Sequence, residues 1–146
     1  MGVVAVLVMG GLGLAAIGGS GSGPAPVAQA VATDQFTMCG SAQRYTCVVD
    51  GDTIWWRGQN LRLESYDTPE PYTDICGGER EIALAHRASA RLLELLNSNQ
   101  FSVQTFGTDR YGRTLATIKV DGVDVGDILI AEGLARRWPN GHEFWC

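Results

Sequence analysis

Charged residues are confined to one part of this chain. Residues 1–33 contain no Asp, Glu, Lys or Arg, and every charged side chain lies between Asp34 and Cys146. The sequence therefore divides into an uncharged N-terminal segment, 1–33, and a charged segment, 34–146. The second segment is long enough for one globular domain of ordinary size and too short for two. We expect a single folded domain in residues 34–146.

The N-terminal segment has the features of a targeting sequence. Residues 1–19 are apolar and rich in Gly, and a Gly/Ser/Pro stretch leads to Ala28-Gln29-Ala30, a small-x-small pattern of the kind that signal peptidase cleaves. An export signal is the simplest interpretation, although no Lys or Arg precedes the apolar residues. The alternative is an uncleaved membrane anchor formed by residues 2–19, which are barely long enough to span a bilayer. Both interpretations place the domain outside the cytoplasm, as a periplasmic, secreted or membrane-anchored protein.

Four cysteines indicate a domain stabilised by disulfides. An even number of cysteines in an exported chain favours two bridges, and the sequence contains no Cys-x-x-Cys motif and only two His residues that could complete a zinc site. Three pairings are possible. We favour Cys39 with Cys47, which closes a short loop, and Cys76 with Cys146, which closes a loop of about 70 residues and should remove about 4 kcal/mol of unfolded-state entropy. Free buried thiols are the alternative.

Hydrophobic periodicity predicts a mainly β domain with helices. Short β-type runs are expected at 44–50, 53–57 and 61–65, with a turn at 58–60, and two more at 101–106 and 113–120. Residues 78–96 form a long amphipathic helix, whose apolar face would be Ile82, Ala85, Ala88, Leu92, Leu95 and Leu96. Asp121-Gly122 marks a hairpin, and a short helix at 125–132 would end at Gly133. Five strands, one long helix and one short helix suggest a small β-barrel with helices packed on it.

The net charge limits how the chain can bind other molecules. The formal charge is −5 and the isoelectric point is near 4.9. Bulk attraction to nucleic acid is therefore excluded, and any phosphate binding must come from a few placed residues with a shallow dependence on salt. The sequence also lacks a P-loop lysine motif and a Gly-x-Ser-x-Gly elbow. Chemistry in this domain must use carboxylates and arginines.

Two acidic clusters lie where adjacent strands could bring them together. Asp50-Gly51-Asp52-Thr53 lies between two predicted strands, and Asp67-Thr68-Pro69-Glu70 follows the third. Each cluster by itself is typical of an ordinary turn or of a loop that precedes a helix. Together they supply four carboxylates, which repel one another unless a cation compensates them. Oxygen ligands without imidazole or thiolate favour Ca²⁺ or Mg²⁺.

Two arginines accompany these clusters. Arg62 lies on the strand that leads to Asp67, and Arg113 opens the strand after Asp109-Arg110-Tyr111-Gly112. A guanidinium binds phosphate through two parallel hydrogen bonds, which suits a phosphodiester whose negative charge increases during attack. Salt-bridged surface arginines are the alternative. For Arg136-Arg137 we favour a solvated pair, with assistance to phosphate binding as the alternative.

Several motifs in the same order and spacing resemble the staphylococcal nuclease (thermonuclease) family. They are Val49-Asp50-Gly51-Asp52-Thr53, Arg62, Asp67-Thr68-Pro69-Glu70, Asp109-Arg110-Tyr111-Gly112-Arg113 and Glu132-Gly133-Leu134-Ala135. The resemblance covers roughly residues 44–136. It implies a five-stranded OB-fold β-barrel and Ca²⁺-dependent hydrolysis of DNA and RNA to products that end in 3′-phosphate. A single strand is the expected preferred substrate.

The same resemblance assigns roles to individual residues. Asp52 and Asp67 resemble the side-chain ligands of Ca²⁺, with the Thr68 backbone carbonyl beside them. Arg62 and Arg113 resemble the phosphate clamp, and Glu70 occupies the position of the general base. Arg110 and Tyr111 match positions near the terminal phosphate and sugar of the nucleotide, and Asp50 is expected to have a structural role.

The C-terminal part departs from the family pattern. Bacterial relatives often carry a C-terminal helix and tyrosines that stack on the base, whereas this chain has Trp138, Phe144, Trp145 and Cys146 there. We expect a Cys76–Cys146 bridge to replace that helix in holding the C-terminal segment down. The alternative functions are a catalytically silent OB-fold module that binds nucleic acid or protein, and a Mg²⁺ phosphodiesterase for small nucleotides. No obligate protein partner is implied.

Overall fold

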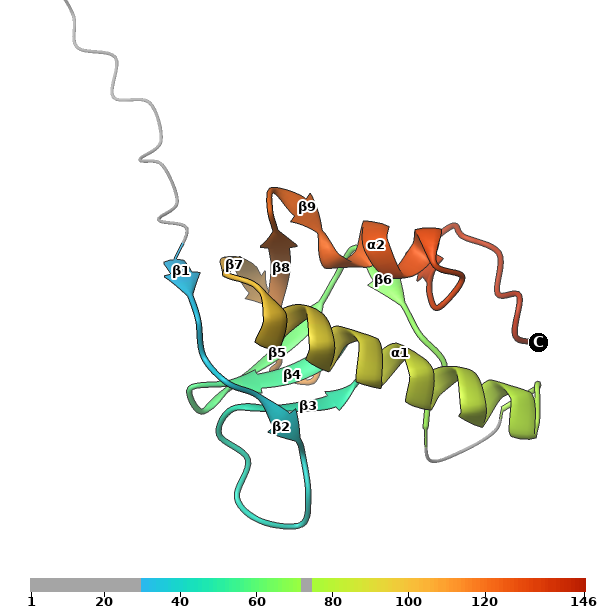
Figure 1. Ribbon diagram of the computed structural model, residues 1–146. Helices are drawn as coiled ribbons and strands as arrows, with labels where there is room; N and C mark the ends of the chain where they lie inside the picture. Colours follow the sequence, from blue (N-terminus) through green and yellow to red (C-terminus); the bar gives the residue numbers. More distant parts are fainter. Residues whose placement is uncertain (1–29, 72–74) are drawn as a thin grey trace, which may run out of the picture.

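The computed structural model describes residues 30–71 and 75–146. The predicted signal or anchor, including residues 2–19, lies outside the described residues. Within them, no helix combines the length and the apolar character that crossing a membrane requires. These described residues build a strongly curled mixed sheet, a separate two-stranded sheet and two helices that pack on the curled sheet (Figure 1). The predicted α+β class, with one long and one short helix on a curled OB-like sheet, is confirmed.

Five principal strands of the described chain form the curled sheet. They are β3 (Cys47–Asp50), β4 (Thr53–Trp56), β5 (Gln59–Leu63), β7 (Phe101–Thr108) and β8 (Thr114–Val120). The first three form an antiparallel meander, β7 and β8 form an antiparallel hairpin, and β5 joins the two groups by pairing with β8 in parallel. The sheet curls around a continuous core in which large apolar side chains such as Ile54, Leu61 and Phe101 are buried.

The turn between β4 and β5 differs from the prediction. Residues 58–60 were expected to form it, but Gln59 and Asn60 already pair with β4, and the turn consists of Arg57 and Gly58. Both residues have positive φ, 51° and 81°, as the two-residue turns that match strand twist require. Arg57 tolerates this conformation while its guanidinium forms two hydrogen bonds of 2.9 Å with Asp34.

Short strands extend the sheet beyond the predicted ones. β1 (Ala30–Ala32) pairs with β7 in antiparallel fashion, and β2 (Thr37–Met38) pairs with β3 in parallel. The segment between them carries Phe36, which is buried in the core and whose backbone exchanges two hydrogen bonds with the Asn97 side chain. The disulfide Cys39–Cys47 follows. Residues 30–39 thus belong to the folded domain, including four residues, 30–33, of the predicted N-terminal segment.

The helix α1 (Glu79–Ser98) lies across the sheet and covers its concave side (Figure 1). Leu84, Ala88 and Leu92 are among the residues on its buried face. Ile82, which was expected on that face, is only half-buried, because the helix is rotated so that Leu84 and the carboxylate of Glu81 point inward. The short helix α2 (Val125–Ala131) begins at Asp124, whose side chain accepts a hydrogen bond from the Gly126 N–H.

A separate two-stranded sheet fixes the C-terminal segment beside Asp67. β6 (Tyr66–Asp67) pairs with β10 (Arg136–Arg137) in antiparallel fashion, with Arg136 opposite Asp67. β9 (Val123–Asp124) follows the Asp121-Gly122 hairpin and pairs with β8. The chain then ends beside the start of α1, where Cys146 forms a disulfide with Cys76. The two disulfides thus have the pairing that the sequence analysis favoured.

One buried carboxylate organises the start of α1. The oxygen Oε2 of Glu81 accepts hydrogen bonds from the backbone N–H groups of Ile75, Cys76 and Gly77, at 2.8, 3.0 and 2.9 Å. These bonds, led by those from Cys76 and Gly77, lower the pKa of Glu81. The N-cap residue Gly78 offers no side-chain cap. Glu81 therefore holds the segment that precedes the helix in place of a conventional cap.

The bonds of Glu81 predict a pH-dependent contribution to stability. A carboxylate whose pKa is lowered on folding stabilises the protein above its ordinary pKa of 4.5, and this contribution is lost as the pH falls through the lowered value. Glu81→Gln should lower the melting temperature at pH 7, and the difference from the wild type should shrink as the pH falls below 4.5. Glu79→Gln, an exposed change in the same turn, is the matched control. A deficit of Glu81→Gln that stays constant over this pH range would contradict the interpretation.

Candidate functional site

The turn between β3 and β4 buries two carboxylates. Asp52 is only 3% exposed and Asp50 is also buried. The Asp52 N–H donates a hydrogen bond of 3.2 Å to Asp50 Oδ1, and the Thr53 hydroxyl donates one of 3.1 Å to Asp52 Oδ1. Burial raises the pKa of Asp50, and the positive charge of Arg62 opposes this effect. Asp50 thus shapes the turn, which agrees with its expected structural role.

Close packing fixes this turn against the loop that follows β6. A Cβ atom at Gly51 would lie 2.7–2.9 Å from the side chains of Thr68 and Ala88, so only glycine fits there. The carbonyl of Gly51 accepts a hydrogen bond of 2.7 Å from the hydroxyl of Tyr66, a fully buried side chain. Glycine at position 51 therefore lets the turn approach both α1 and β6.

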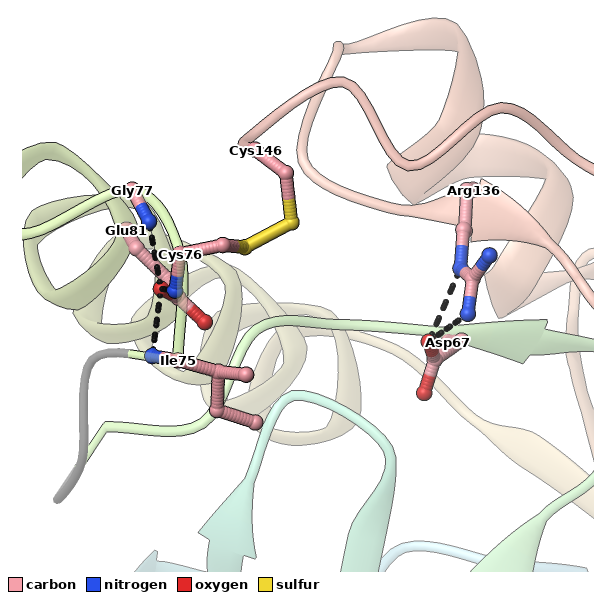
Figure 2. The surroundings of a disulfide bond; sticks show 7 residues. All are labelled: Asp67, Ile75, Cys76, Gly77, Glu81, Arg136 and Cys146. Carbon is pink, nitrogen blue, oxygen red and sulfur yellow. Dashed lines mark hydrogen bonds and ion pairs between the residues drawn. A yellow bond between two sulfur atoms is a disulfide. The ribbon is translucent and has the colours of Figure 1, made fainter.

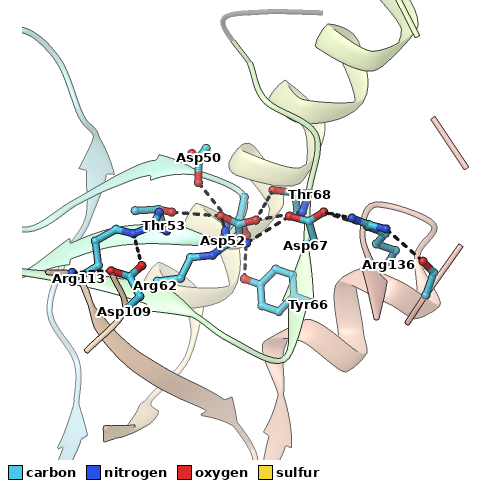
Figure 3. A network of polar contacts seen from close by, with 12 residues as sticks. Asp50, Asp52, Thr53, Arg62, Tyr66, Asp67, Thr68, Asp109, Arg113 and Arg136 are labelled. Carbon is cyan, nitrogen blue, oxygen red and sulfur yellow. Dashed lines mark hydrogen bonds and ion pairs between the residues drawn. The ribbon is translucent and has the colours of Figure 1, made fainter. Parts of the chain in front are cut away.

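The carboxylate of Asp52 also joins the turn to the Asp67–Glu70 loop. Its oxygen Oδ2 accepts hydrogen bonds from the Thr68 N–H at 3.0 Å and from the Thr68 hydroxyl at 3.2 Å (Figure 3). The two acidic clusters, which are separate in the sequence, thus meet through side-chain and backbone bonds. A buried carboxylate without such partners would be strongly destabilising.

The guanidinium of Arg62 bridges the two metal-ligand candidates. It reaches from β5, forms an ion pair with Asp52 Oδ1, and forms a second one of 3.2 Å with Asp67 Oδ1. All three side chains are largely removed from solvent, where opposite charges attract more strongly than in water. The structure therefore brings Arg62, Asp52 and Asp67 into one compact group.

Arg136 completes the group, and the sequence analysis missed it. Its Nε and Nη2 lie 2.9 and 2.8 Å from Asp67 Oδ2, and its side chain is 14% exposed (Figure 3). The expectation of a solvated pair holds for Arg137, which is about half exposed and pairs with Asp127, but is wrong for Arg136. Only the pairing of β10 with β6 reveals the contact, because 69 positions separate the two residues in the sequence.

The second predicted clamp residue, Arg113, is oriented by its own loop. Asp109 Oδ1 accepts hydrogen bonds from the N–H groups of Tyr111 and Arg113, and its Oδ2 accepts one of 2.7 Å from Arg113 Nε. Desolvation would raise the pKa of Asp109, but these hydrogen bonds outweigh it and lower the pKa. The loop closes through Gly112 at a φ of 77°. The orientation of the Arg113 side chain is thus fixed by the hydrogen bond from its Nε to Asp109.

Arg62 and Arg113 line the same surface cleft. It has a volume of about 410 Å³ and is also lined by Arg110, Tyr111 and Trp138. Tyr111 is 67% exposed and Trp138 is 49% exposed, so both rings are accessible to a ligand. The guanidinium groups of Arg110 and Arg113 lie 4.7 and 5.4 Å from the centre of the Tyr111 ring. The cleft therefore combines positive charge with accessible aromatic faces.

Glu70 lies at a second, smaller hollow. This hollow has a volume of about 100 Å³ and is lined by Asp67, Thr68, Glu143 and Trp145, among others. No hydrogen bond or ion pair of the described residues engages the Glu70 carboxylate. Although the residue is exposed overall, partial desolvation of the carboxylate raises its pKa, and the charges of Asp50 and Asp67 add to this effect. The ion pair between Asp67 and Arg62 connects this hollow to the arginine-lined cleft.

Comparisons with known proteins show which family the chain resembles. The family model described as Staphylococcal nuclease homologue matches residues 60–143. The succinoglycan biosynthesis protein ExoI of Rhizobium meliloti (strain 1021) is 36% identical over 92 residues, which cover 60% of this chain and 48% of ExoI. Two proteins of Bacillus subtilis (strain 168) are also similar, each over 95 residues that cover 60% of this chain. The SPbeta prophage-derived endonuclease YokF is 38% identical, and the match covers 31% of its length. The endonuclease YncB is 37% identical, and the match covers 44% of its length.

The chain thus spans about half or less of the curated relatives it matches. The matched range begins at residue 60, after the turn that carries Asp52, and the structure shows that this turn is bonded to the matched part. The fold, the paired carboxylates and the sequence match lead to one conclusion: this chain belongs to the Staphylococcal nuclease homologue family.

Proposed function

We propose that this protein is a Ca²⁺-dependent nuclease that hydrolyses phosphodiester bonds of DNA and RNA. The observation that carries the proposal is the group formed by Asp52, Arg62 and Asp67, which lies next to the arginine-lined cleft. Two of the relatives are named endonucleases, and the family is generally metal-dependent. Membership of the family and these names support a nucleic acid as the substrate.

The donor atoms fit a hard divalent cation. No set of three His, Cys, Asp or Glu side chains in the described part of the chain converges on one point. Ca²⁺, however, accepts carboxylates, backbone carbonyls and water together. The carboxylates of Asp52 and Asp67, with the carbonyl of Thr68, would hold the ion. Each carboxylate oxygen has two lone pairs. The contact with Arg62 leaves one acceptor position free on Asp67 Oδ1, whereas Thr53, Thr68 and Arg62 already occupy the positions of Asp52, so one of those contacts would have to give way to the ion. A bound cation would neutralise phosphate charge and activate water.

Two guanidinium groups would bind the phosphate. Arg113 uses Nε for Asp109, and no described residue accepts a hydrogen bond from its Nη atoms. Those atoms are therefore available to a phosphate in the cleft that Arg62 also lines. Because Arg62 and Arg113 are already held by carboxylates, they need little reorganisation when charge builds up on the attacked phosphorus.

Glu70 is the proposed general base. Its carboxylate has no partner within the described residues and has a raised pKa, so it can accept a proton from an attacking water more readily than a typical surface carboxylate. Its hollow adjoins Asp67, one of the proposed metal ligands. Attack by this water and departure of the 5′-oxygen would leave a 3′-phosphate. No covalent enzyme intermediate is required.

The cleft favours a strand whose bases are accessible. Tyr111 and Trp138 present exposed rings on which bases can stack, and base-aromatic stacking contributes about 1–3 kcal/mol per base. Bases inside a duplex are paired and stacked on one another, so they cannot reach these rings. We infer that single strands are preferred and that Arg110 and Tyr111 contact the nucleotide beside the cleaved bond.

The cellular location is part of the proposal. Two disulfides suit an oxidising compartment, and the uncharged N-terminal segment suits export. We propose that the protein acts in the periplasm or as a secreted enzyme, with a membrane tether through residues 2–19 as the alternative form. N-terminal sequencing of the purified protein distinguishes cleavage after Ala30 from a retained anchor.

Hydrolysis of single-stranded DNA by the full chain tests the catalytic assignment. With Ca²⁺, Glu70→Gln and Arg113→Ala should each lower kcat by at least about 100-fold, since each removes a group that acts in the transition state. The wild type should be inactive with chelator. Analysis of the ends by mass spectrometry should show 3′-phosphates.

Arg87→Ala is the control for the loss of one positive charge, because Arg87 is exposed on α1 and lines neither the arginine-lined cleft nor the Glu70 hollow. Its activity should match that of the wild type. A folded, oxidised protein that binds single strands without cutting them would reject the nuclease function in favour of the silent binding module. Cleavage of small diesters but not of strands would favour the phosphodiesterase instead.

Aromatic substitutions test the preference for single strands. Tyr111→Ala and Trp138→Ala should each raise KM for single-stranded DNA by about tenfold, the effect of losing one stacked base, with a smaller change for duplex DNA. Phe106→Ala, which removes another exposed aromatic ring that does not line the cleft, is the matched control. If KM rises equally for both substrates, the rings do not select single strands.

A further inference from the structure

The C-terminal strap, residues 136–146, closes over one side of the site. It begins at β10, which pairs with β6 beside Asp67, and ends at the disulfide between Cys146 and Cys76. Figure 2 shows both ends of the strap: the disulfide on one side and the Arg136–Asp67 contact on the other. The strap is therefore attached both to a proposed metal ligand and to the segment that precedes α1.

Arg136 is held on several sides. Trp138 and Trp145 both lie against its guanidinium, with ring centres 5.3 and 5.6 Å from Cζ. Its Nη1 donates a hydrogen bond of 3.2 Å to the carbonyl of Gly141, while Nε and Nη2 contact Asp67. A guanidinium that contacts two rings and is hydrogen-bonded through several of its nitrogens has little rotational freedom. The Asp67 carboxylate, which Arg136 contacts through Nε and Nη2, therefore also has little rotational freedom.

The disulfide fixes one of the two rings. Trp145 is 6% exposed and immediately precedes Cys146. Its backbone packs so closely on Gly77 that a Cβ atom there would lie 2.0 Å from the Trp145 carbonyl oxygen. Gly77 is one of the three residues whose N–H groups bond to Glu81. A continuous series of contacts thus links Glu81, the disulfide, Trp145, Arg136 and Asp67.

We propose that Arg136 is a positioning residue that orients Asp67 for metal binding, and that the Cys76–Cys146 disulfide keeps Arg136 in place through Trp145. This inference rests on the proposed function, since it concerns the same metal site. Arg62 binds Oδ1 of Asp67 and Arg136 binds Oδ2, so the plane of the carboxylate is fixed from both sides. The lone pairs that remain point in set directions before the metal ion arrives.

Charge and orientation predict opposite effects when Arg136 is removed. A positive charge beside a metal ligand repels a cation, so its loss would by itself increase Ca²⁺ affinity. Loss of orientation would decrease the affinity, because the carboxylate must then be ordered on binding. The proposal requires that orientation dominates. The sign of the change in Ca²⁺ affinity therefore decides between a positioning residue and a mere counter-charge.

Calorimetric titration of Ca²⁺ into the metal-free full chain measures this sign. Arg136→Gln should weaken Ca²⁺ binding by about tenfold relative to Arg137→Gln, a matched control that removes the same charge from the adjacent residue, which pairs with Asp127 instead. Arg136→Lys should restore part of the affinity, because one ammonium donor can still reach Asp67. In cleavage assays at saturating Ca²⁺, Arg136→Gln should lower kcat more than it raises KM.

The disulfide has its own matched pair of variants. Cys76→Ser/Cys146→Ser should weaken Ca²⁺ binding about threefold, whereas Cys39→Ser/Cys47→Ser, which opens the bridge beside β2, should leave it unchanged. In the metal-free protein, the losses of melting temperature caused by Arg136→Gln and by opening Cys76–Cys146 should be less than additive, because both disrupt the same contacts.

Several outcomes would overturn the proposal. They are equal or tighter Ca²⁺ binding by Arg136→Gln than by Arg137→Gln, equal effects of the two disulfide variants on Ca²⁺ affinity, and full additivity in the metal-free protein. A wild type that binds no Ca²⁺ would instead contradict the proposed metal. The additivity measurement, which needs no metal, still decides in that case whether the strap and Arg136 act together.

Discussion

The buried carboxylate of Asp52 is the interaction on which the rest of the site depends. Its two oxygens accept hydrogen bonds from Thr53 and Thr68 and form an ion pair with Arg62. Isolated burial of such a charge would cost several kcal/mol, so the fold must supply these partners. Doing so brings the β3–β4 turn, β5 and the loop after β6 together. The requirement to compensate one charge thus assembles three separate segments into a site.

Acidic and basic side chains alternate along a row that begins at Asp52 and ends at Arg136. Arg62 lies between Asp52 and Asp67, and Asp67 lies between Arg62 and Arg136. Each side chain fixes the next, so the proposed metal ligands and one clamp arginine are ordered before any ligand binds. Arg113 is ordered separately by Asp109. This arrangement reconciles an acidic protein with the proposed anionic substrate, because the positive groups are concentrated where a phosphate would lie.

Sequence patterns predicted the parts of the fold that depend on local information. The periodicity of the long helix, the Asp121-Gly122 hairpin and the five principal strands follow from residues close in the chain, and the structure contains all of them. The turn at Arg57-Gly58 was misplaced by one or two residues because Gly58-Gln59-Asn60 is equally typical of a turn. The rotation of α1 could not be predicted from hydrophobic periodicity. Glu81 is a charged residue, and it is buried because its carboxylate binds backbone N–H groups of the preceding segment.

Only the site contacts that depend on local sequence motifs could be predicted. Motifs placed Asp52, Arg62 and Asp67 near one another, and the structure bonds them directly. The contact between Arg136 and Asp67 could not be predicted, because it depends on the pairing of the two-residue strand β10 with β6. Nothing in the local sequence sets that register. Glu70 differs from both groups, because it is near the carboxylates but has no described partner that orients it. A ligand is therefore needed to define its contacts.

A crystal structure with Ca²⁺ and a hydrolysis-resistant phosphorothioate oligonucleotide would locate both the cation and the bound phosphate. In the proposed site, Asp52 and Asp67 bind the cation, and Arg62 and Arg113 bind the phosphate. We expect one cation bound by both carboxylates and by the Thr68 carbonyl, with a phosphate contacting both arginines in the cleft. A cation at other carboxylates, or a strand bound along the exposed arginines of α1 with the cleft empty, would contradict this assignment.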